Sequence, residues 1–303
     1  MTIKRRDFLG QMAAGSAIVS MPAFLSGCGV QQATQVAAPT PDNPFMTWFG
    51  IDEATIARVM AELTANGADT ADLYFQHQRT NNLAMEDGIV SRANSGISQG
   101  VGLRVVIGDQ TGYAFTEDLT LESMFAAART AAAIANGSAI VPPQAYHPKR
   151  TGDLYTTELP GADVGLDRKL PIVKHVDARA RAGDPAVQKV SVNWADADER
   201  VLIATLDGHL IMDHRPMTRL TAMVTATKDG ETQSGYSNIA ARQDYDWYTT
   251  ERIDKMVDEA VERTMILFEA KRPPAGEMPV ILAAGASGIP VSYTHLTLPT
   301  ITE

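Results

Sequence analysis

The sequence predicts an α+β fold in which a unit of helix, antiparallel strands and helix occurs twice. Apolar residues follow helical spacing in four segments, at 51–66, 121–134, 166–181 and 251–268. Between these segments, apolar and polar residues alternate with period two, which is typical of half-buried strands. Asp-Gly pairs punctuate the alternating runs, and such pairs favour hairpin turns. We therefore expect two helix pairs combined with antiparallel sheets.

The first unit covers about residues 50–137. Asp52 is a candidate N-cap for its first helix, and Gly67 follows the end of that helix. The second helix carries Met124 and Ala128 on one face and ends at an Asn-Gly pair. The strands between the helices are predicted at 71–76, at 82–85, from residue 89, at 101–107 and at 113–115, with clear alternation in the runs 71–76 and 101–107.

The second unit covers about residues 163–270 and follows a proline-marked connection at 141–160. Its strands are predicted around 190–194, 201–203 and 220–224, between the two remaining helices. The turn at 86–88 resembles the later Asp-Gly turn at 207–208, which favours a duplication. Chance similarity between two Asp-Gly hairpins is the alternative.

Composition and charge exclude several classes of function. The chain has 303 residues, of which 45% are hydrophobic and 20% charged, which is ordinary for a globular protein. The net charge of −10 opposes nucleic-acid binding, because phosphate contacts need clustered lysine and arginine. Since Cys28 is the only cysteine, an internal disulfide and a cysteine-rich metal cluster are both excluded.

The N-terminus predicts export. Arg5 and Arg6 precede an apolar stretch at 9–25, an arrangement that resembles a bacterial twin-arginine signal peptide over residues 1–27. The end of that stretch resembles a lipobox, which would make Cys28 the lipidated first residue of the mature chain, followed by a flexible tether to residue 47. We expect a periplasmic protein or a lipoprotein tethered to the membrane through Cys28. The alternative is a plain signal peptide with an incidental cysteine.

No catalytic or metal-binding constellation is found among the residues themselves. His209 and His214 lie five apart, so on one strand they would face opposite sides, and neither has a second ligand nearby. Ser287 lacks the flanking pattern of a nucleophile elbow. The acidic run at 196–199 lacks calcium-loop spacing and is interpreted as a solvated hairpin turn. We therefore assign no catalytic and no metal-ligating residue.

Several stretches together resemble the TldD branch of the TldD/PmbA metallopeptidases: 67–76, 86–88, 99–104, 112–114 and 273–280. The resemblance spans about residues 50–288 and implies an N-terminal α+β domain at 48–275, followed by a β-rich catalytic domain. It also implies a zinc site on a His-Glu-x-x-x-His helix with a later cysteine, the glutamate acting as general base. Peptide substrates and a homo- or heterodimer with a family subunit are implied as partners.

The sequence departs from this family where the zinc helix is expected. Residues 276–289 are similar to the start of the catalytic domain, but His295 is followed by leucine and Pro299 would break a helix. Residues 290–303 look like one reading frame of a sequencing adapter, so we hypothesise a non-native tail. We thus expect an inactive N-terminal fragment of an exported TldD-like zinc metallopeptidase. Two alternatives are a non-catalytic peptide-binding partner of the same superfamily and an exported binding lipoprotein.

Overall fold

The computed structural model describes residues 43–135, 141–149, 155, 157–272, 274–277 and 279. The chain divides into two compact units, 1–40 and 41–303, and every described residue belongs to the second. The helices are α2 (Pro44–Phe49), α3 (Glu53–Leu63), α4 (Leu121–Ile134), α5 (Leu166–Gly183) and α6 (Thr250–Met265), with short 3-10 turns η1 (Gly161–Asp163), η2 (Tyr245–Trp247) and η3 (Ile266–Glu269). The strands are β1 (Thr70–Glu86), β2 (Ile89–Ile107), β3 (Gln110–Thr116), β4 (His147–Lys149), β5 (Val187–Thr205), β6 (His209–Lys228) and β7 (Glu231–Ala241).

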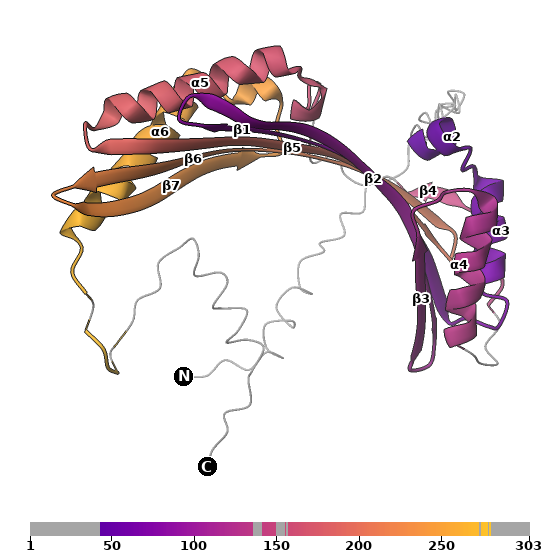
Figure 1. The fold of residues 1–303 in the computed structure, drawn as a ribbon. Coiled ribbons are helices and arrows are strands. Elements are labelled where there is room, and N and C mark those ends of the chain that lie inside the picture. The colour runs from indigo at the N-terminus through magenta and orange to yellow at the C-terminus, as the bar shows by residue number, and fades with distance from the viewer. Residues whose placement is uncertain are drawn as a thin grey trace, which may run out of the picture. The chain divides into compact units, whose positions relative to one another are not determined.

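All seven strands belong to one sheet (Figure 1). Its order is β3-β2-β1-β5-β6-β4, and β7 also pairs with β6. The sequence led us to expect separate sheets, but β1 pairs with β5 along 72–86, with Phe75 opposite Leu202, and this pairing joins them. The α+β class with antiparallel strands is confirmed, apart from the short parallel pair of β4 and β6.

The strands are longer than the sequence indicated. The runs predicted at 71–76 and 82–85 form the single strand β1 of 17 residues, and β5 and β6 have 19 and 20 residues. The polar residues that interrupt the alternation therefore lie inside strands and not in turns. The turn at Asp87 and Gly88 fits its prediction, because both residues have positive φ values (50° and 78°), as a type I′ hairpin requires.

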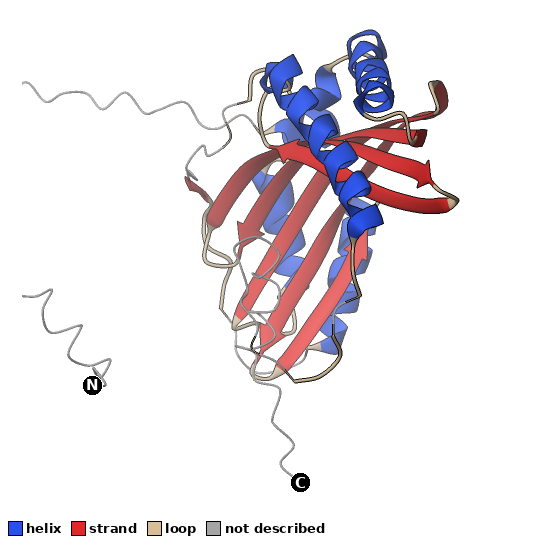
Figure 2. Cartoon of the chain, turned by 90° about the vertical axis from the view of Figure 1, so that its left-hand side faces the viewer, coloured by secondary structure: helices blue, strands red, loops and turns tan. Residues whose placement is uncertain are grey.

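The helices cover one face of the sheet and leave the other open (Figures 1 and 2). On β5, Leu202 packs in a hydrophobic core with α3 and α4, whereas Trp194 packs in a second core with α5 and α6. Both positions are even-numbered and so point to the same face of the strand. We call this the helix-covered face and the opposite side the open face. The central part of the helix-covered face lies between the two cores.

Local signals explain the helix boundaries. The carboxylate of Asp52 accepts a hydrogen bond from the Thr55 amide at 2.7 Å, so the predicted N-cap of α3 is confirmed, and this bond lowers the pKa of Asp52. Helix α4 has the predicted bounds of 121–134, and α6 begins one residue before its predicted start.

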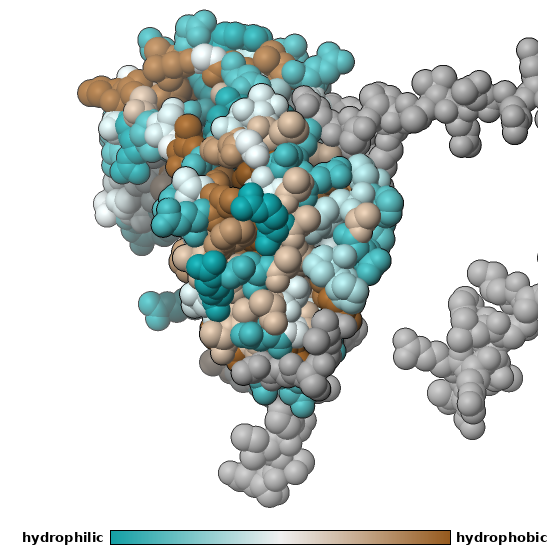
Figure 3. All heavy atoms as spheres, turned by 90° about the vertical axis from the view of Figure 1, so that its right-hand side faces the viewer, coloured by the Kyte–Doolittle hydropathy of each residue, from teal (hydrophilic) through white to brown (hydrophobic). Residues whose placement is uncertain are grey.

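None of the helices in the described ranges is long and apolar enough to cross a bilayer. On the side that carries α3 and α4, hydrophobic patches lie among hydrophilic residues (Figure 3).

Candidate functional site

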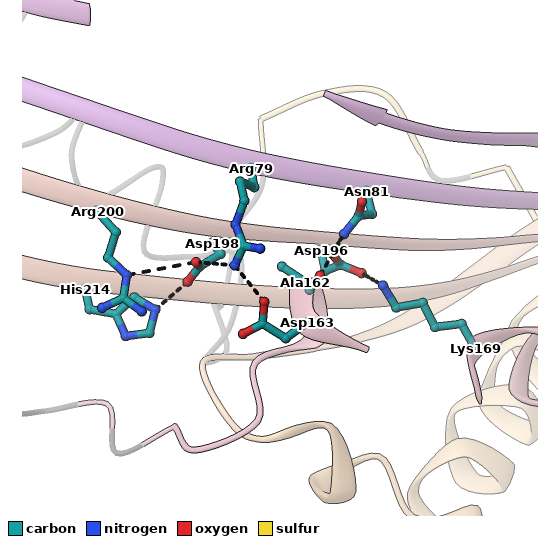
Figure 4. Close-up of polar contacts among 9 residues, drawn as sticks. All are labelled: Arg79, Asn81, Ala162, Asp163, Lys169, Asp196, Asp198, Arg200 and His214. Atoms are coloured by element: carbon teal, nitrogen blue, oxygen red, sulfur yellow. Dashed lines mark hydrogen bonds and ion pairs between the residues drawn. The ribbon is translucent and has the colours of Figure 1, made fainter. Parts of the chain in front are cut away.

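Charged side chains gather on the helix-covered face between the two cores (Figure 4). They come from the middle of β1, β5 and β6 and from the start of α5, and their contacts define a polar junction. Its members are Arg79, Asn81, Lys169, Asp196, Asp198, Arg200 and His214, with Asp163 from the turn η1. The same strands thus carry apolar side chains at both ends and ionised ones at the centre.

Asp198 is the acceptor at one side of the polar junction. Its carboxylate is 4% exposed, accepts a hydrogen bond from Arg79 at 2.8 Å and is bonded to His214 Nε2. Burial by itself would raise the pKa of Asp198, but the bonds from His214 and Arg79 outweigh burial and hold that pKa well below its usual range. The Arg79 guanidinium also reaches Asp163 at 2.7 Å and so joins η1 to the sheet.

Asp196 is the acceptor at the other side. Its Oδ2 atom lies 2.6 Å from Lys169 Nζ and 2.9 Å from the indole nitrogen of Trp194, and its Oδ1 atom accepts a bond from Asn81 at 2.7 Å. The Lys169 side chain is 5% exposed and that of Asp196 is 0% exposed. The buried carboxylate therefore has a cationic partner and two neutral donors, which is what a buried charge needs to be tolerated.

The interpretation of residues 196–199 as a solvated turn is wrong. These residues lie in the middle of β5, and Asp196 and Asp198 are both 4% exposed. The alternation of Val190, Val192 and Trp194 carries a signal that we missed, because the two aspartates continue the same buried face. Aspartates whose side chains lie on the core-facing side of a strand require cationic partners. Here those partners come from other strands and from α5.

The polar junction does not fit a zinc ion. Lys169 and Arg79 already donate hydrogen bonds to the two buried carboxylates, and their positive charges would repel a metal cation. Over the described ranges, no three His, Cys, Asp or Glu side chains converge as metal ligands. The polar junction therefore has a structural role. Its hydrogen bonds and ion pairs join β1, β5, β6, η1 and α5 in the region between the two hydrophobic cores.

The histidines of the described residues do not meet in space as a ligand set. His209 pairs loosely with Asp207 at 3.5 Å, while His214 belongs to the polar junction. His175 lies 2.6 Å from Asp254, between α5 and α6. The ring of His77 lies against Trp48, with 4.7 Å between the ring centres, and burial together with nearby Arg79 lowers the pKa of His77.

A hollow of about 500 Å³ lies on the open face over β1, β2 and β3. Alternation along the strands supplies its lining, with Tyr74 and Gln76 on β1 opposite Gly102 and Gly100 on β2. A methyl group on Gly100 would lie 2.8 Å from the Thr116 carbonyl oxygen, so only glycine fits at this position. We call this cavity the open-face hollow.

Aromatic and charged groups at the open-face hollow equip it for binding. Tyr113 and Phe115 on β3 are 56% and 69% exposed, although aromatic rings are usually covered. Asp72 and Arg104, which form an ion pair at 2.6 Å, line the hollow together with Glu117. Exposed rings beside charged groups give the hollow the character of a binding surface.

Several sequence predictions concern positions outside the described residues. These are the export residues Arg5 and Arg6, the lipidation site Cys28, the loop residue Ser287 and the departing His295. The assignments at these positions stay predictions.

Two family models match the chain. The first is described as PmbA/TldA metallopeptidase domain 1 and matches residues 71–135, and the second, described as PmbA/TldA metallopeptidase central domain, matches 159–268. Together they cover more than half of the chain. The first match runs from β1 to the end of α4, and the second runs from η1 to η3.

Curated relatives carry the name Metalloprotease TldD homolog. The protein from Haemophilus influenzae is 31% identical over 255 residues, which are 82% of this chain and 53% of that protein. The protein from Buchnera aphidicola subsp. Schizaphis graminum is 24% identical over 246 residues, which are 79% of this chain and 51% of that protein. The chain thus spans about half the length of the curated relatives it matches.

Solved structures share the fold at low sequence identity. A crystal structure from Thermotoga maritima, described as a candidate modulator of a DNA gyrase, has a TM-score of 0.59 at 20% identity and aligns with 74% of this chain and 50% of its own. TldE from Thermococcus kodakarensis has a TM-score of 0.50 at 13% identity, with 70% and 47% of the two chains covered. These likenesses support the fold alone.

Proposed function

Since the chain belongs to the PmbA/TldD metallopeptidase family, we propose that it forms the substrate-side part of an exported, TldD-like zinc metallopeptidase that acts on peptides. The family assignment supports a metallopeptidase, and the finer features of zinc, export and substrate are our proposal. Because the matched relatives are about twice as long, hydrolysis is proposed for the whole protein and peptide binding for the described residues.

The open-face hollow is the observation that carries the proposal. It combines two exposed aromatic rings, Tyr113 and Phe115, with the ion pair of Asp72 and Arg104. Such a surface can stack on apolar or aromatic side chains of a peptide, but among the described residues it brings together no set of metal ligands. A role on the substrate side of a peptidase accounts for both properties.

The zinc ion is proposed to bind outside the described residues, because the polar junction does not fit it. The family pattern of a His-Glu-x-x-x-His helix would supply its ligands and a general base. Export through a signal with Arg5 and Arg6, and tethering through a lipid on Cys28, are proposed from the sequence. We also propose that the protein pairs with a subunit of its own family.

The test expresses the protein from its genomic locus and measures hydrolysis of a mixed peptide substrate with and without zinc. Phe115→Ala should raise KM about 5-fold and leave kcat unchanged, because it removes a contact made equally to substrate and transition state. Tyr236→Ala is the matched control, since Tyr236 is also an exposed aromatic residue (53%) and lies on the distant strand β7.

Equal effects of the two variants on KM would exclude the open-face hollow from substrate binding. Peptide binding without zinc-dependent hydrolysis would assign the protein to the alternative role of a non-catalytic partner. If the protein neither binds nor hydrolyses peptides, the proposal is refuted and the binding lipoprotein is the remaining alternative.

A further inference from the structure

Three side chains of the open-face hollow lie in one row. Tyr113 and Phe115 are alternate residues of β3, and Glu117 follows the strand at the same spacing, so alternation places all three on the open face. The Tyr113 side chain leans over β2, because a methyl group on Gly102 would lie 3.0 Å from the tyrosine hydroxyl. The row therefore presents two aromatic rings and, beside them, a carboxylate.

The charges that line the hollow do not cancel. The Arg104 guanidinium lies 2.6 Å from the Asp72 carboxylate, so these two charges compensate each other. Glu117 is exposed, and over the described ranges its side chain forms no ion pair and no hydrogen bond. The lining thus carries one uncompensated negative charge.

Charges next to the hollow have the same balance. Arg215 reaches the Tyr74 hydroxyl from β6, but it is paired with Asp213 at 2.6 Å. Glu199 of β5 accepts a hydrogen bond from Gln76, a lining residue, at 2.6 Å. Among the described residues no cation pairs with Glu199. The surroundings therefore add a second uncompensated negative charge to that of Glu117.

A cation complements exposed rings that lie beside a carboxylate. The face of an aromatic ring attracts a positive charge, and the effect is largest when the cation is planar and can stack. A guanidinium group can in addition donate two parallel hydrogen bonds to one carboxylate, which an ammonium group cannot do in the same geometry. The pair of features at Phe115 and Glu117 therefore favours arginine over lysine.

Other ligand groups match the hollow less well. An acidic side chain would be repelled by Glu117, and an aromatic or aliphatic one would cover that carboxylate without neutralising it. The volume of about 500 Å³ lies within the range of roughly 300–1,000 Å³ that is typical of ligand sites. A single long side chain can therefore enter the hollow without displacing its lining.

We propose that the open-face hollow selects an arginine side chain of the peptide ligand, with the guanidinium stacked on the exposed rings and hydrogen-bonded to Glu117. Glu117 is then a specificity-determining residue, and Phe115 supplies a contact surface. The inference rests on the proposed function in taking a peptide as the ligand, and it adds the class of side chain that the hollow prefers. It requires no hydrolysis by this chain.

The test titrates the 303-residue chain with three capped tripeptides and follows binding by NMR. The peptides carry arginine, citrulline or phenylalanine between two alanines, and citrulline keeps the planar shape of arginine without its charge. The arginine peptide should bind about 5-fold more tightly than the citrulline peptide. Raising NaCl from about 50 mM to about 500 mM should reduce this ratio, because exposed charges are screened.

A charge-neutral variant separates the role of Glu117 from that of the rings. Glu117→Gln should bring the arginine-to-citrulline ratio to about 1 and leave binding of the citrulline peptide unchanged. Glu231→Gln is the matched control, since Glu231 is an exposed carboxylate on the distant strand β7, and it should leave the ratio unchanged. Unfolding temperatures of both variants verify that each is folded.

Four results would overturn the inference: binding of none of the three peptides, equal binding of the arginine and citrulline peptides, tighter binding of the phenylalanine peptide, or a preference for arginine that survives Glu117→Gln. If the chain selects arginine but the protein from its genomic locus hydrolyses no peptide, the proposed function fails and this inference stands. If that protein hydrolyses peptides but the arginine preference is absent, this inference fails and the proposed function stands.

Discussion

Lys169 Nζ lies 2.6 Å from Asp196 Oδ2, and the two side chains are 5% and 0% exposed. This ion pair connects α5 to the middle of β5 at a place where the two hydrophobic cores do not meet. Burying both charges is costly, so the pair is tolerated because Asn81 and Trp194 complete the hydrogen bonds of the carboxylate. Removing one partner should therefore lower the stability of the protein by far more than the intact pair contributes to it.

We predict that Lys169→Met lowers the free energy of unfolding by about 3 kcal/mol, because it leaves the Asp196 carboxylate buried without a cation. Urea unfolding followed by circular dichroism measures this difference. Lys174→Met is the matched control, since Lys174 is exposed on the same helix, and it should change stability by less than about 0.5 kcal/mol. Similar decreases in the free energy of unfolding for the two variants would contradict a buried ion pair of Lys169 and Asp196.

The polar junction should also make stability depend on pH. The folded pKa of Asp198 lies below its ordinary value of 3.8, so its contribution is present above that pH and is lost as the pH falls through the folded pKa. Asp198→Asn should destabilise the chain by about 2 kcal/mol at neutral pH, and this gap should narrow progressively below about pH 4. Thermal unfolding between pH 3 and pH 7 measures the gap, with exposed Asp109→Asn as the control. A gap independent of pH would refute the assignment.

Gly112 lets α4 pack directly on β3. A methyl group at this position would lie 2.0 Å from the Ala131 carbonyl oxygen, which belongs to the helix backbone and cannot turn aside. We expect Gly112→Ala to cost about 3 kcal/mol of stability. Gly96→Ala is its control, because the nearest atom there is the Thr80 hydroxyl at 3.2 Å, and it should be nearly neutral. Differential scanning calorimetry measures the stability of the two variants, and equal losses of stability would contradict the close packing at Gly112.

The 303-residue chain should neither hold zinc nor hydrolyse peptides. Its sequence contains no His-Glu pair, and no three potential ligands converge within the described ranges. Elemental analysis after incubation with zinc and dialysis should find less than about 0.1 ion per chain, far below the single ion of a structural or catalytic site. Zinc-dependent hydrolysis by the purified chain would contradict this prediction.

The export signal can be tested separately from the fold. Replacing Arg5 and Arg6 together by lysine should retain the protein in the cytoplasm of a bacterial host, because a receptor reads the arginine pair. Cys28→Ala should still be exported but should move from the membrane fraction to the soluble periplasmic fraction. Fractionation and immunoblotting measure both outcomes. Membrane attachment of Cys28→Ala would exclude lipidation as the anchor.

Much of the fold is predictable because local periodicity determines it. The helix at 121–134 and the N-cap at Asp52 follow from spacing and capping chemistry. The turn at 87–88 follows from its Asp-Gly pair, because these residue types tolerate the positive φ angles that the turn requires. The length of β1 is not predictable in the same way. Its polar centre interrupts the hydrophobic pattern, and partners on β5 and η1 make that centre tolerable within a strand.

The sequence by itself determined the family resemblance, the α+β class and the order of helices and strands, because these depend on local pattern and on motifs. Only the tertiary structure decided that Asp196 and Asp198 are buried partners of Lys169 and Arg79, since those residues lie 27 or more positions apart. It also decided that the described strands join into one sheet, because β1 pairs with β5. Pairing between distant segments, and the burial of charge that this pairing permits, leaves no local signature in the chain.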